Sequence, residues 1–507
     1  MSNPKIKAMK NIMRVDAGVG GNIQRIETIG WMLFLKIWDA REKDLELTEE
    51  NFISPLVNLR WADSEGVHIA EDYRWRNWAA NPEGITGEVL RSFVNKELFP
   101  AIKGMVIPPK SDDLNIERLR RRLLMIRQSF ADMNNYMTNG TAMRELINYI
   151  HANIDYDKSG QRDAFGDIYE SFLHDLQGAK DSGEFYTPRA ITNFAIEMLD
   201  PQLGESILDP AAGTGGFLCS AINYVATNYV TPGSISDNDV LMQSVSGVEK
   251  KALPTLLCMT NLIHHGFDDP SRIKRGNSLT KPINSYTEED EVDIVATNPP
   301  FGGSEQDTIL SNFPVAYRLS ETADLFMTVI HTSLKDGGRA AVVYPETPPP
   351  DGKKQNIVRR LVEECNLHTI IQLPNSTFKP YASIATNLLF FIKGTPTTET
   401  WFYQHRVPEG QKHYSKTKPI ISEHLDSIRE WWDNREESEY SWKVTVREIV
   451  DANYGIFDWK NPNLPEEEIE DAEILLKRYK GQREEVDSIR YNLIEMLREA
   501  LDKSKSD

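Results

Sequence analysis

The chain has 507 residues, of which 40% are hydrophobic and 26% are charged, and its formal net charge is −19 at pH 7. This length exceeds one ordinary hydrophobic core and predicts two or three domains. We find no apolar signal segment and no run long enough to cross a bilayer, so we expect a cytoplasmic protein without a membrane partner. The three cysteines form no Cys-x-x-Cys pair, which indicates neither a disulfide framework nor a metal site.

The acidic charge argues against a protein that grips DNA by itself, because phosphate binding requires basic side chains. Two interpretations remain open. In the first, the protein never meets nucleic acid, and composition alone slightly favours this view. In the second, the protein presents a local basic patch, while a partner subunit provides most of the DNA-binding affinity and recognises the DNA sequence.

Residues 1–160 are predicted to form an all-α N-terminal domain. The apolar run Ile29–Trp38 is too long for a typical strand, and segments with helical periodicity follow at Leu119–Met125 and Ile147–Ile154. From about Phe165 the pattern changes, and short β-rich runs alternate with helical stretches as far as Gly394. This alternation predicts an α/β domain over residues 161–400 with a doubly wound, mostly parallel, Rossmann-like sheet.

Residues 401–507 are predicted to form a polar tail that ends in a long charged helix. Along this helix, apolar residues recur at alternating spacings of three and four: Val486, Ile489, Leu493, Met496 and Ala500. Such a narrow stripe is typical of a helix that docks on a partner helix. Packing against the chain's own domains explains the periodicity equally well.

A glycine-rich turn, Asp209-Pro-Ala-Ala-Gly-Thr-Gly-Gly-Phe217, follows the first predicted strand of the α/β domain and leads into a helix. Glycines allow the backbone to turn tightly and to approach a ligand closely at this end of a sheet. The turn has an acidic residue at its start and no basic residue, so it suits a ligand without phosphate. S-adenosylmethionine is such a ligand.

Glu249 ends the next predicted strand, in the sequence Gly247-Val-Glu249. A carboxylate at this point can accept hydrogen bonds from both hydroxyls of a ribose. Its distance along the chain from Asp209, 40 residues, exceeds the usual ~20 of dinucleotide folds. We therefore expect an additional helix or loop around residues 231–239.

A third motif, Asn298-Pro-Pro-Phe301, follows the predicted buried strand Val292–Thr297. Prolines remove backbone donors, so the Asn298 side-chain carbonyl and the Pro299 main-chain oxygen are both free to accept hydrogen bonds from one amino group. These bonds hold the amine and favour its pyramidal form, and Phe301 can stack on the base. A base in duplex DNA must be flipped out to reach such a turn.

These three motifs resemble those of amino-methyltransferases that act on N6 of adenine. The wider pattern resembles the modification subunit of type I restriction–modification systems. It includes Gly183–Arg189, which is similar to the segment over the cofactor's methionine end, and Arg275–Leu279, Thr386–Phe391 and Pro408–Lys412. The resemblance covers nearly the whole chain.

The resemblance implies methyl transfer from S-adenosylmethionine to a flipped adenine in double-stranded DNA, with Asn298, Pro299, Pro300 and Phe301 as the catalytic turn. It implies a specificity subunit flanked by two modification subunits, and a restriction subunit can join them. The implied cofactor-binding residues are Glu184, Phe185, Tyr186, Thr187, Pro188, Arg189, Asp209, Ala211, Gly213, Thr214, Gly215, Gly216, Phe217, Glu249, Asn277 and Asn298.

Two features are less determined by the sequence. Phe378 or Tyr381, in a loop after a late strand, can face Phe301 across the base, and ordinary loop packing explains either residue equally well. The segment Pro345–Pro350 is rich in proline, whereas members of the family usually have a Pro-Asp/Asn-Gly turn there.

Two other functions fit some of these residues. A stand-alone methyltransferase acting on RNA or on a glutamine side chain also uses an Asn-Pro-Pro-aromatic turn, but it needs neither the helical N-terminus nor the C-terminal helix. A non-catalytic scaffold of a defence complex needs no intact Asn298, Glu249 or glycine turn. An adjacent reading frame with two target-recognition repeats would distinguish DNA modification from both.

Overall fold

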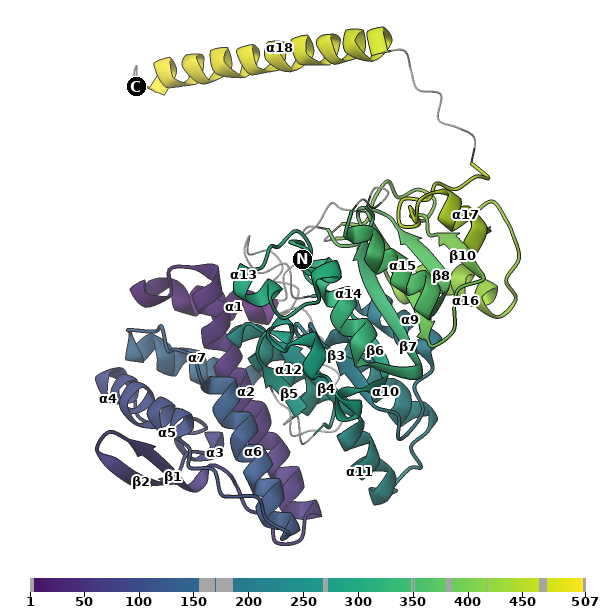
Figure 1. The fold of residues 1–507 in the computed structure, drawn as a ribbon. Coiled ribbons are helices and arrows are strands. Elements are labelled where there is room, and N and C mark those ends of the chain that lie inside the picture. The colour runs from purple at the N-terminus through teal and green to yellow at the C-terminus, as the bar shows by residue number, and fades with distance from the viewer. Residues whose placement is uncertain are drawn as a thin grey trace. The chain divides into compact units, whose positions relative to one another are not determined.

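The computed structural model describes residues 4–154, 169, 186–267, 272–347, 350, 352–379, 385–415, 417–464 and 472–504. The chain divides into two compact units, Met1–Lys460 and Asn461–Asp507. The first contains the helical N-terminal region and the central sheet, and the second contains one long helix (Figure 1).

The N-terminal region is helical, as predicted, and its central element is α2 (Asn22–Thr48). The apolar run that predicted this helix is almost wholly buried, because every residue from Trp31 to Leu35 is 0% exposed. One antiparallel hairpin, β1–β2, was not predicted. The remaining elements are α1 (Pro4–Ile12), β1 (Val57–Asp63), β2 (Gly66–Asp72), α3 (Trp75–Trp78), α4 (Gly87–Phe93), α5 (Phe99–Lys103), α6 (Leu114–Phe130) and α7 (Gly140–Asn153).

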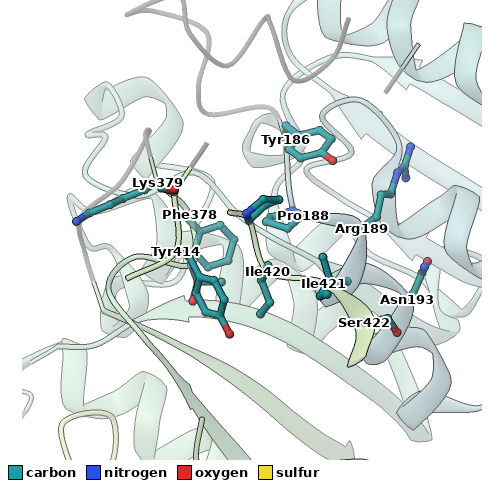
Figure 2. A pocket seen from close by; sticks show the side chains of 14 residues that line it. Tyr186, Pro188, Arg189, Asn193, Phe378, Lys379, Tyr414, Ile420, Ile421 and Ser422 are labelled. Atoms are coloured by element: carbon teal, nitrogen blue, oxygen red, sulfur yellow. The ribbon is translucent and has the colours of Figure 1, made fainter. Parts of the chain in front are cut away.

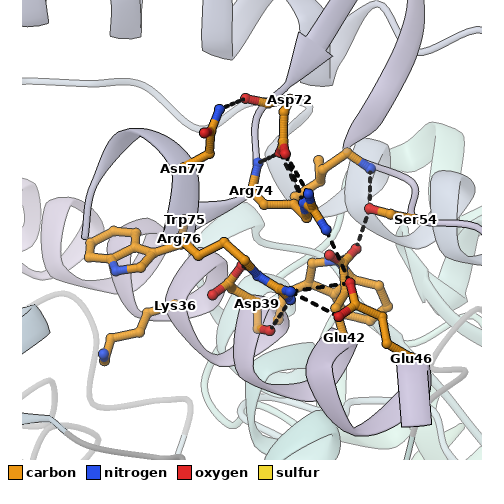
Figure 3. A network of polar contacts seen from close by, with 12 residues as sticks. Lys36, Asp39, Glu42, Glu46, Ser54, Asp72, Arg74, Trp75, Arg76 and Asn77 are labelled. Atoms are coloured by element: carbon orange, nitrogen blue, oxygen red, sulfur yellow. Dashed lines mark hydrogen bonds and ion pairs between the residues drawn. The ribbon is translucent and has the colours of Figure 1, made fainter. Parts of the chain in front are cut away.

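A polar network ties the hairpin and α3 to α2 (Figure 3). Arg76 donates to Asp39 at 2.7 Å and pairs with Glu46 at 2.9 Å, while Arg74 pairs with Glu46 at 3.0 Å. Beside them, Glu42 accepts hydrogen bonds from neighbouring side chains, and burial raises its pKa to about 7. Glu42 therefore lies in this network as a buried carboxyl group, next to the ion pairs of Arg74 and Arg76.

A nine-stranded sheet forms the core of the second half of unit one. The strand order β11-β10-β8-β9-β7-β6-β3-β4-β5 reverses between β3 and β6, which is the doubly wound arrangement that the sequence predicted. The strands are β3 (Ile207–Asp209), β4 (Val245–Glu249), β5 (Ile273–Arg275), β6 (Val292–Thr297), β7 (Leu334–Pro345), β8 (Cys365–Leu373), β9 (Thr386–Lys393), β10 (Glu399–Gln404) and β11 (Ser441–Thr445).

The sheet is mixed rather than uniformly parallel. Strands β3 to β7 pair in parallel, but β9 lies antiparallel between β7 and β8, and β11 is antiparallel to β10. Strand β10 pairs in parallel with β8, so the sheet continues beyond residue 400, where the sequence predicted only a polar tail. Strand β10 is only six residues long and carries a weak sequence pattern, which explains why it was not predicted.

Helices cover both faces of the sheet (Figure 1). Alternate residues of β6 enter opposite hydrophobic clusters, with Ile294 and Ala296 on one side and Val295 on the other. The helices are α9 (Arg189–Leu199), α10 (Gly216–Asn228), α11 (Ile235–Ser244), α12 (Ala252–His264), α13 (Asp307–Leu310), α14 (Thr322–Ser333), α15 (Lys354–Glu364), α16 (Asp426–Asp433) and α17 (Val446–Asp451). Helix α11 confirms the additional element expected between Asp209 and Glu249.

The N-terminal helices and the sheet domain share one hydrophobic cluster. Helix α2 packs on α12, and an added Cβ at Gly30 would lie 3.5 Å from Leu256 and 3.6 Å from Leu253. The Ser129 hydroxyl of α6 also donates to the Met259 sulfur of α12 at 2.7 Å. Helix α12 therefore belongs to the core of both regions.

The second unit contains α18 (Ala472–Ser504), which confirms the predicted long helix. Its stripe residues Val486, Ile489, Leu493 and Met496 are between 53% and 68% exposed. The side chain of Ala500 lies outside the described residues. Within the described ranges, no helix combines the length and the apolar character that crossing a membrane requires.

Candidate active site

The three sequence motifs meet at the carboxyl ends of adjacent strands. Asp209 ends β3, Glu249 ends β4, and Asn298 directly follows β6. Because β3 lies between β4 and β6, and the strand order reverses between β3 and β6, these residues lie at the topological switch point. Ligands of open α/β sheets bind in the crevice at this position.

Asp209 is 1% exposed, and its side chain is held by two hydrogen bonds. The Thr297 hydroxyl donates to its Oδ1 at 2.6 Å, and the Ala211 amide donates to the same oxygen at 3.0 Å. Burial, with a smaller contribution from nearby Glu249, raises the pKa of Asp209 to about 7 against the lowering effect of these hydrogen bonds. Asp209 thus connects the end of β3 to the residue before the Asn298–Phe301 turn.

Glu249 is 7% exposed, and its carboxylate accepts two backbone hydrogen bonds. The Gly213 amide donates to Oε2 at 3.0 Å and the Lys251 amide donates to Oε1 at 2.7 Å. Burial raises the pKa of Glu249, and these two amides oppose that effect. A carboxylate has about four acceptor positions, so roughly two remain for a ligand.

The glycine turn follows its predicted path. Gly213 and Gly215 have φ angles of +53° and +80°, which favour glycine. At Gly215 a Cβ would also lie 2.8 Å from the Cys258 sulfur. Two side chains fix the turn from outside, because Asn261 donates to the Thr214 carbonyl at 3.0 Å and Arg189 donates to the Gly216 carbonyl at 3.1 Å.

The side chain of Asn298 has one satisfied end and one free end. Its Nδ2 donates to the Thr187 hydroxyl at 3.0 Å. Its Oδ1 is buried and has no hydrogen-bond partner in the described part of the chain. Buried polar atoms are nearly always paired, so such an oxygen marks a position where a ligand donor fits. Phe301, three residues on, is partly buried and packs against both hydrophobic clusters.

Asn277 lies at the end of β5, where it caps a short helical turn by accepting from the Leu279 amide at 3.0 Å. The adjoining Ser278 hydroxyl donates to the Pro210 carbonyl at 2.6 Å, and the Gly276 amide donates to the Glu249 carbonyl at 2.9 Å. The end of β5 is therefore fastened to both the glycine turn and the Glu249 strand.

The segment before α9 is only partly described. Tyr186, Thr187, Pro188 and Arg189 lie at the start of α9, whereas Glu184 and Phe185 lie outside the described residues. Tyr381 also lies outside them. Phe378 is 5% exposed and lines a cavity of about 310 Å³ together with Tyr186 and Pro188 (Figure 2). None of residues 298–301 lines that cavity.

Three site residues were not assigned these roles from the sequence. Thr187 was predicted to contact the cofactor but also holds Asn298, Thr297 donates to Asp209, and Asn261 holds the glycine turn. A buried threonine directly before the Asn-Pro-Pro motif is a signal that could have indicated Thr297. No local pattern indicates Asn261, because its contact depends on the packing of α12 beneath the turn.

The residues at the switch point fit S-adenosylmethionine better than a nucleotide with phosphates. Glu249 retains acceptor capacity for ribose hydroxyls. The glycine turn, residues 209–217, contains no Lys or Arg that would bind phosphate. In the described residues, no group of His, Cys, Asp or Glu side chains is arranged to hold a metal ion.

Fold and site together define a doubly wound methyltransferase with an Asn-Pro-Pro-Phe turn. Residues 160–470 match the family model of N-6 DNA methylases, and residues 3–150 match that of the HsdM N-terminal domain. The chain belongs to the N-6 DNA methylase family, as an adenine-specific DNA methyltransferase of the type I restriction–modification class.

Individual relatives are similar to this chain over nearly its whole length. The chain is 46% identical to the type I restriction enzyme EcoEI methylase subunit of Escherichia coli, over 98% of this chain and 97% of the relative. A solved modification subunit of a putative type I restriction enzyme from Vibrio vulnificus YJ016 is 37% identical, with a TM-score of 0.77, over 91% of this chain and 96% of that one. A chain from a structure of type I R-M complex assembly and conformational transition is 32% identical, with a TM-score of 0.74, over 97% of both chains.

Proposed function

We propose that this protein transfers a methyl group to N6 of a flipped adenine in double-stranded DNA, as the modification subunit of a cytoplasmic type I restriction–modification complex. The unpartnered Oδ1 of Asn298 is the observation that carries the proposal. An acceptor without a donor at the end of β6 is the group that an exocyclic amine requires. Family membership supports the reaction and the class of substrate.

The cofactor that fits the site is S-adenosylmethionine, which supplies the methyl group when bound. Glu249 would accept hydrogen bonds from the ribose hydroxyls with its remaining acceptor positions. The glycine turn and Asn277 would enclose the nucleoside, and Tyr186 to Arg189 would lie at the methionine end. The Arg189 contact with Gly216 links that segment to the turn.

During the reaction, the chain's own residues hold the amine and exclude water. Asn298 Oδ1 and the Pro299 carbonyl would each accept one amine hydrogen, which localises the nitrogen lone pair toward the methyl donor. Phe301 would stack on the adenine, and Pro300 would keep the turn rigid. Electrostatic positioning of this kind acts strongly because the site is largely buried.

The sequence is read elsewhere in the proposed assembly. A specificity subunit would supply target recognition, with two modification chains beside it, and a restriction subunit would join the complex. The narrow apolar stripe on α18, formed by Val486, Ile489, Leu493 and Met496, is of the kind that docks on a partner helix and supports an intermolecular role. Delegated recognition also explains how a chain with a net charge of −19 acts on DNA.

The test is transfer of a labelled methyl group by the chain co-expressed with its specificity partner. Duplexes that contain the target site should acquire label at adenine N6, detected by digestion to nucleosides and mass spectrometry. Duplexes in which the target adenine is replaced by 2-aminopurine, which lacks the 6-amino group, should not. Label on cytosine, RNA or protein instead would contradict the proposal.

A further inference from the structure

A cavity next to Tyr186–Arg189, the segment proposed to hold the methionine end of the cofactor, has side chains that suit an anion. It lies between the start of α9, the loop after β8 and residues 414–422 (Figure 2). Among its lining residues are Tyr186, Pro188, Thr377, Phe378, Lys379 and Tyr414. Its volume is about 310 Å³, which is large enough for part of a nucleotide.

Thr377 supplies an unused hydrogen-bond donor in the cavity wall. The residue is 3% exposed, and its hydroxyl oxygen is buried without a hydrogen-bond partner in the described residues. A buried hydroxyl is normally paired, so this group is available to a ligand with an acceptor oxygen. The neighbouring Ser376 hydroxyl, by contrast, accepts from the Tyr414 amide at 3.0 Å.

Positive charge gathers at the same place. Lys379 lines the cavity, and its ammonium has no acidic partner among the residues described. Tyr414, Ser415 and Pro419 also line the cavity, and the described residues of the same segment include two exposed lysines, Lys412 and Lys418, and a single acidic residue, Glu409. This local excess of cations stands out in a chain of net charge −19.

The cavity adjoins the acceptor site but is separate from it. Tyr186 and Pro188 line the cavity, and Thr187 between them accepts the hydrogen bond from Asn298. Residue Leu373, which ends β8, and Thr297, which ends β6, bring their loops to the same edge of the sheet. A ligand in the cavity would therefore lie next to a base held by Asn298.

We propose that this cavity binds a backbone phosphate of the DNA strand that carries the target adenine, with Thr377 and Lys379 as its ligands. The inference rests on the proposed function, because it assumes that the DNA strand runs from a target adenine that is held at Asn298. A phosphodiester has only acceptor oxygens and one negative charge, which a hydroxyl donor and an ammonium complement. Such a contact positions the strand without reading its sequence.

The experiment measures equilibrium DNA binding by the complex of this chain with its specificity partner. Duplexes carry one neutral methylphosphonate at each position flanking the target adenine in turn. At one position the neutral linkage should weaken binding by the wild-type complex about tenfold, the equivalent of one charge-assisted hydrogen bond. Lys379→Gln should show the same loss on unmodified DNA and no further loss on that modified duplex.

Thr377→Val should behave in the same way, and the two variants should leave the dissociation constant of S-adenosylmethionine unchanged. Lys379→Gln should also reduce the slope of log K against log salt by about 1, as expected for one lost phosphate contact. Lys443→Gln, which removes an exposed lysine from β11 at the edge of the sheet, is the matched control and should keep the full slope.

Losses that add independently at every methylphosphonate position would overturn the proposal. So would an unchanged salt slope for Lys379→Gln, a change at a half-buried lysine that does not depend on the folding of Thr377→Val. Because binding is measured rather than turnover, a complex that binds DNA but methylates no adenine would refute the proposed function and still leave the phosphate contact measurable.

Discussion

The Thr187 hydroxyl accepts a hydrogen bond from Asn298 Nδ2 at 3.0 Å, and this contact leaves Asn298 Oδ1 buried with no partner in the described part of the chain. The two residues are 111 positions apart in the sequence. One comes from the segment before α9 and the other from the end of β6. The contact therefore divides the amide into an anchored donor and an available acceptor.

Replacing Asn298 tests the acceptor itself. Asn298→Ala should abolish nearly all methyl transfer, because no side-chain oxygen remains to hold the amine. Cofactor binding should stay within a few-fold of wild type. Transfer of labelled methyl groups and calorimetry with S-adenosylmethionine measure the two effects. Substantial turnover by the variant would show that the amine is held elsewhere.

Replacing Thr187 tests the anchor. Thr187→Val keeps the shape of the side chain but removes the acceptor for Nδ2, so kcat should fall about tenfold, the value of one hydrogen bond. Thr187→Ser restores the hydroxyl and should recover most of that loss. The KM for DNA should change little in either variant. A rise in KM with unchanged kcat would mean that Thr187 contributes to binding and not to the position of the amide.

Replacing Glu249 tests cofactor recognition. Glu249→Ala should weaken S-adenosylmethionine binding by roughly 1–3 kcal/mol, because ribose hydroxyls would lose their buried acceptors. Calorimetry on the purified chain gives this value directly. Glu205→Ala is a suitable control, since Glu205 is also a paired, partly buried carboxylate but bonds to Arg339. An unchanged dissociation constant for Glu249→Ala would show that the carboxylate serves only the backbone amides.

The raised pKa of Asp209 predicts that the stability of the folded chain depends on pH. Its pKa is about 7 in the folded chain and near 3.8 when unfolded, so between these values the folded state holds a proton that the unfolded state releases. The contribution of this carboxyl to the free energy of unfolding therefore falls as pH rises, by up to about 1.4 kcal/mol per pH unit. Asp209→Asn stays neutral, so its melting temperature relative to wild type should increase from pH 5 to pH 7.5.

Asp293→Asn is the control for this experiment. Burial would raise the pKa of Asp293, but hydrogen bonds from Lys335 and Ser206 outweigh it and lower the pKa. Stability from such a group is present above its unfolded pKa and is lost only at lower pH. The difference between Asp293→Asn and wild type should stay constant from pH 5 to pH 7.5. A constant difference for Asp209→Asn as well would contradict the predicted protonation.

Truncation tests the role of α18. A chain that ends at Asn463 retains the whole sheet and all the site residues, so it should bind S-adenosylmethionine normally. It should fail to form a stable complex with the specificity partner, because the stripe from Val486 to Met496 is removed. Size-exclusion chromatography of co-expressed chains measures assembly. Normal assembly by the truncated chain, or site-specific methylation by the full-length chain alone, would contradict delegated recognition.

The sequence predicted the parts of the fold whose signal is local. Strand β6 was predicted with its observed bounds, since a run rich in β-branched and apolar residues directly before Asn-Pro-Pro has few other interpretations. Helix α2 followed from a run too long for a strand. The hairpin β1–β2 was not predicted: its strands are largely exposed, and the apolar alternation of Val57, Leu59 and Trp61 in β1 is a signal that could have indicated it.

Contacts between segments distant in the sequence could not be predicted from the sequence alone. The motifs indicated that Asp209, Glu249 and Asn298 share one edge of the sheet, because strand ends can be placed from topology. The partner of the Asn298 amide could not be placed in this way. Thr187 reaches it only through the packing of α9 against the sheet, and Asn261 reaches the glycine turn only through α12.

The contact of Gly30 with the leucines of α12 has a consequence for modularity. The two family models meet between residues 150 and 160, yet one hydrophobic cluster contains described residues from both sides of that boundary. Helix α12 also supports the glycine turn from below, through Cys258 and Asn261. The N-terminal region is thus not separable from the sheet domain in its packing, because α12, which completes the N-terminal core, is also the helix that supports the glycine turn.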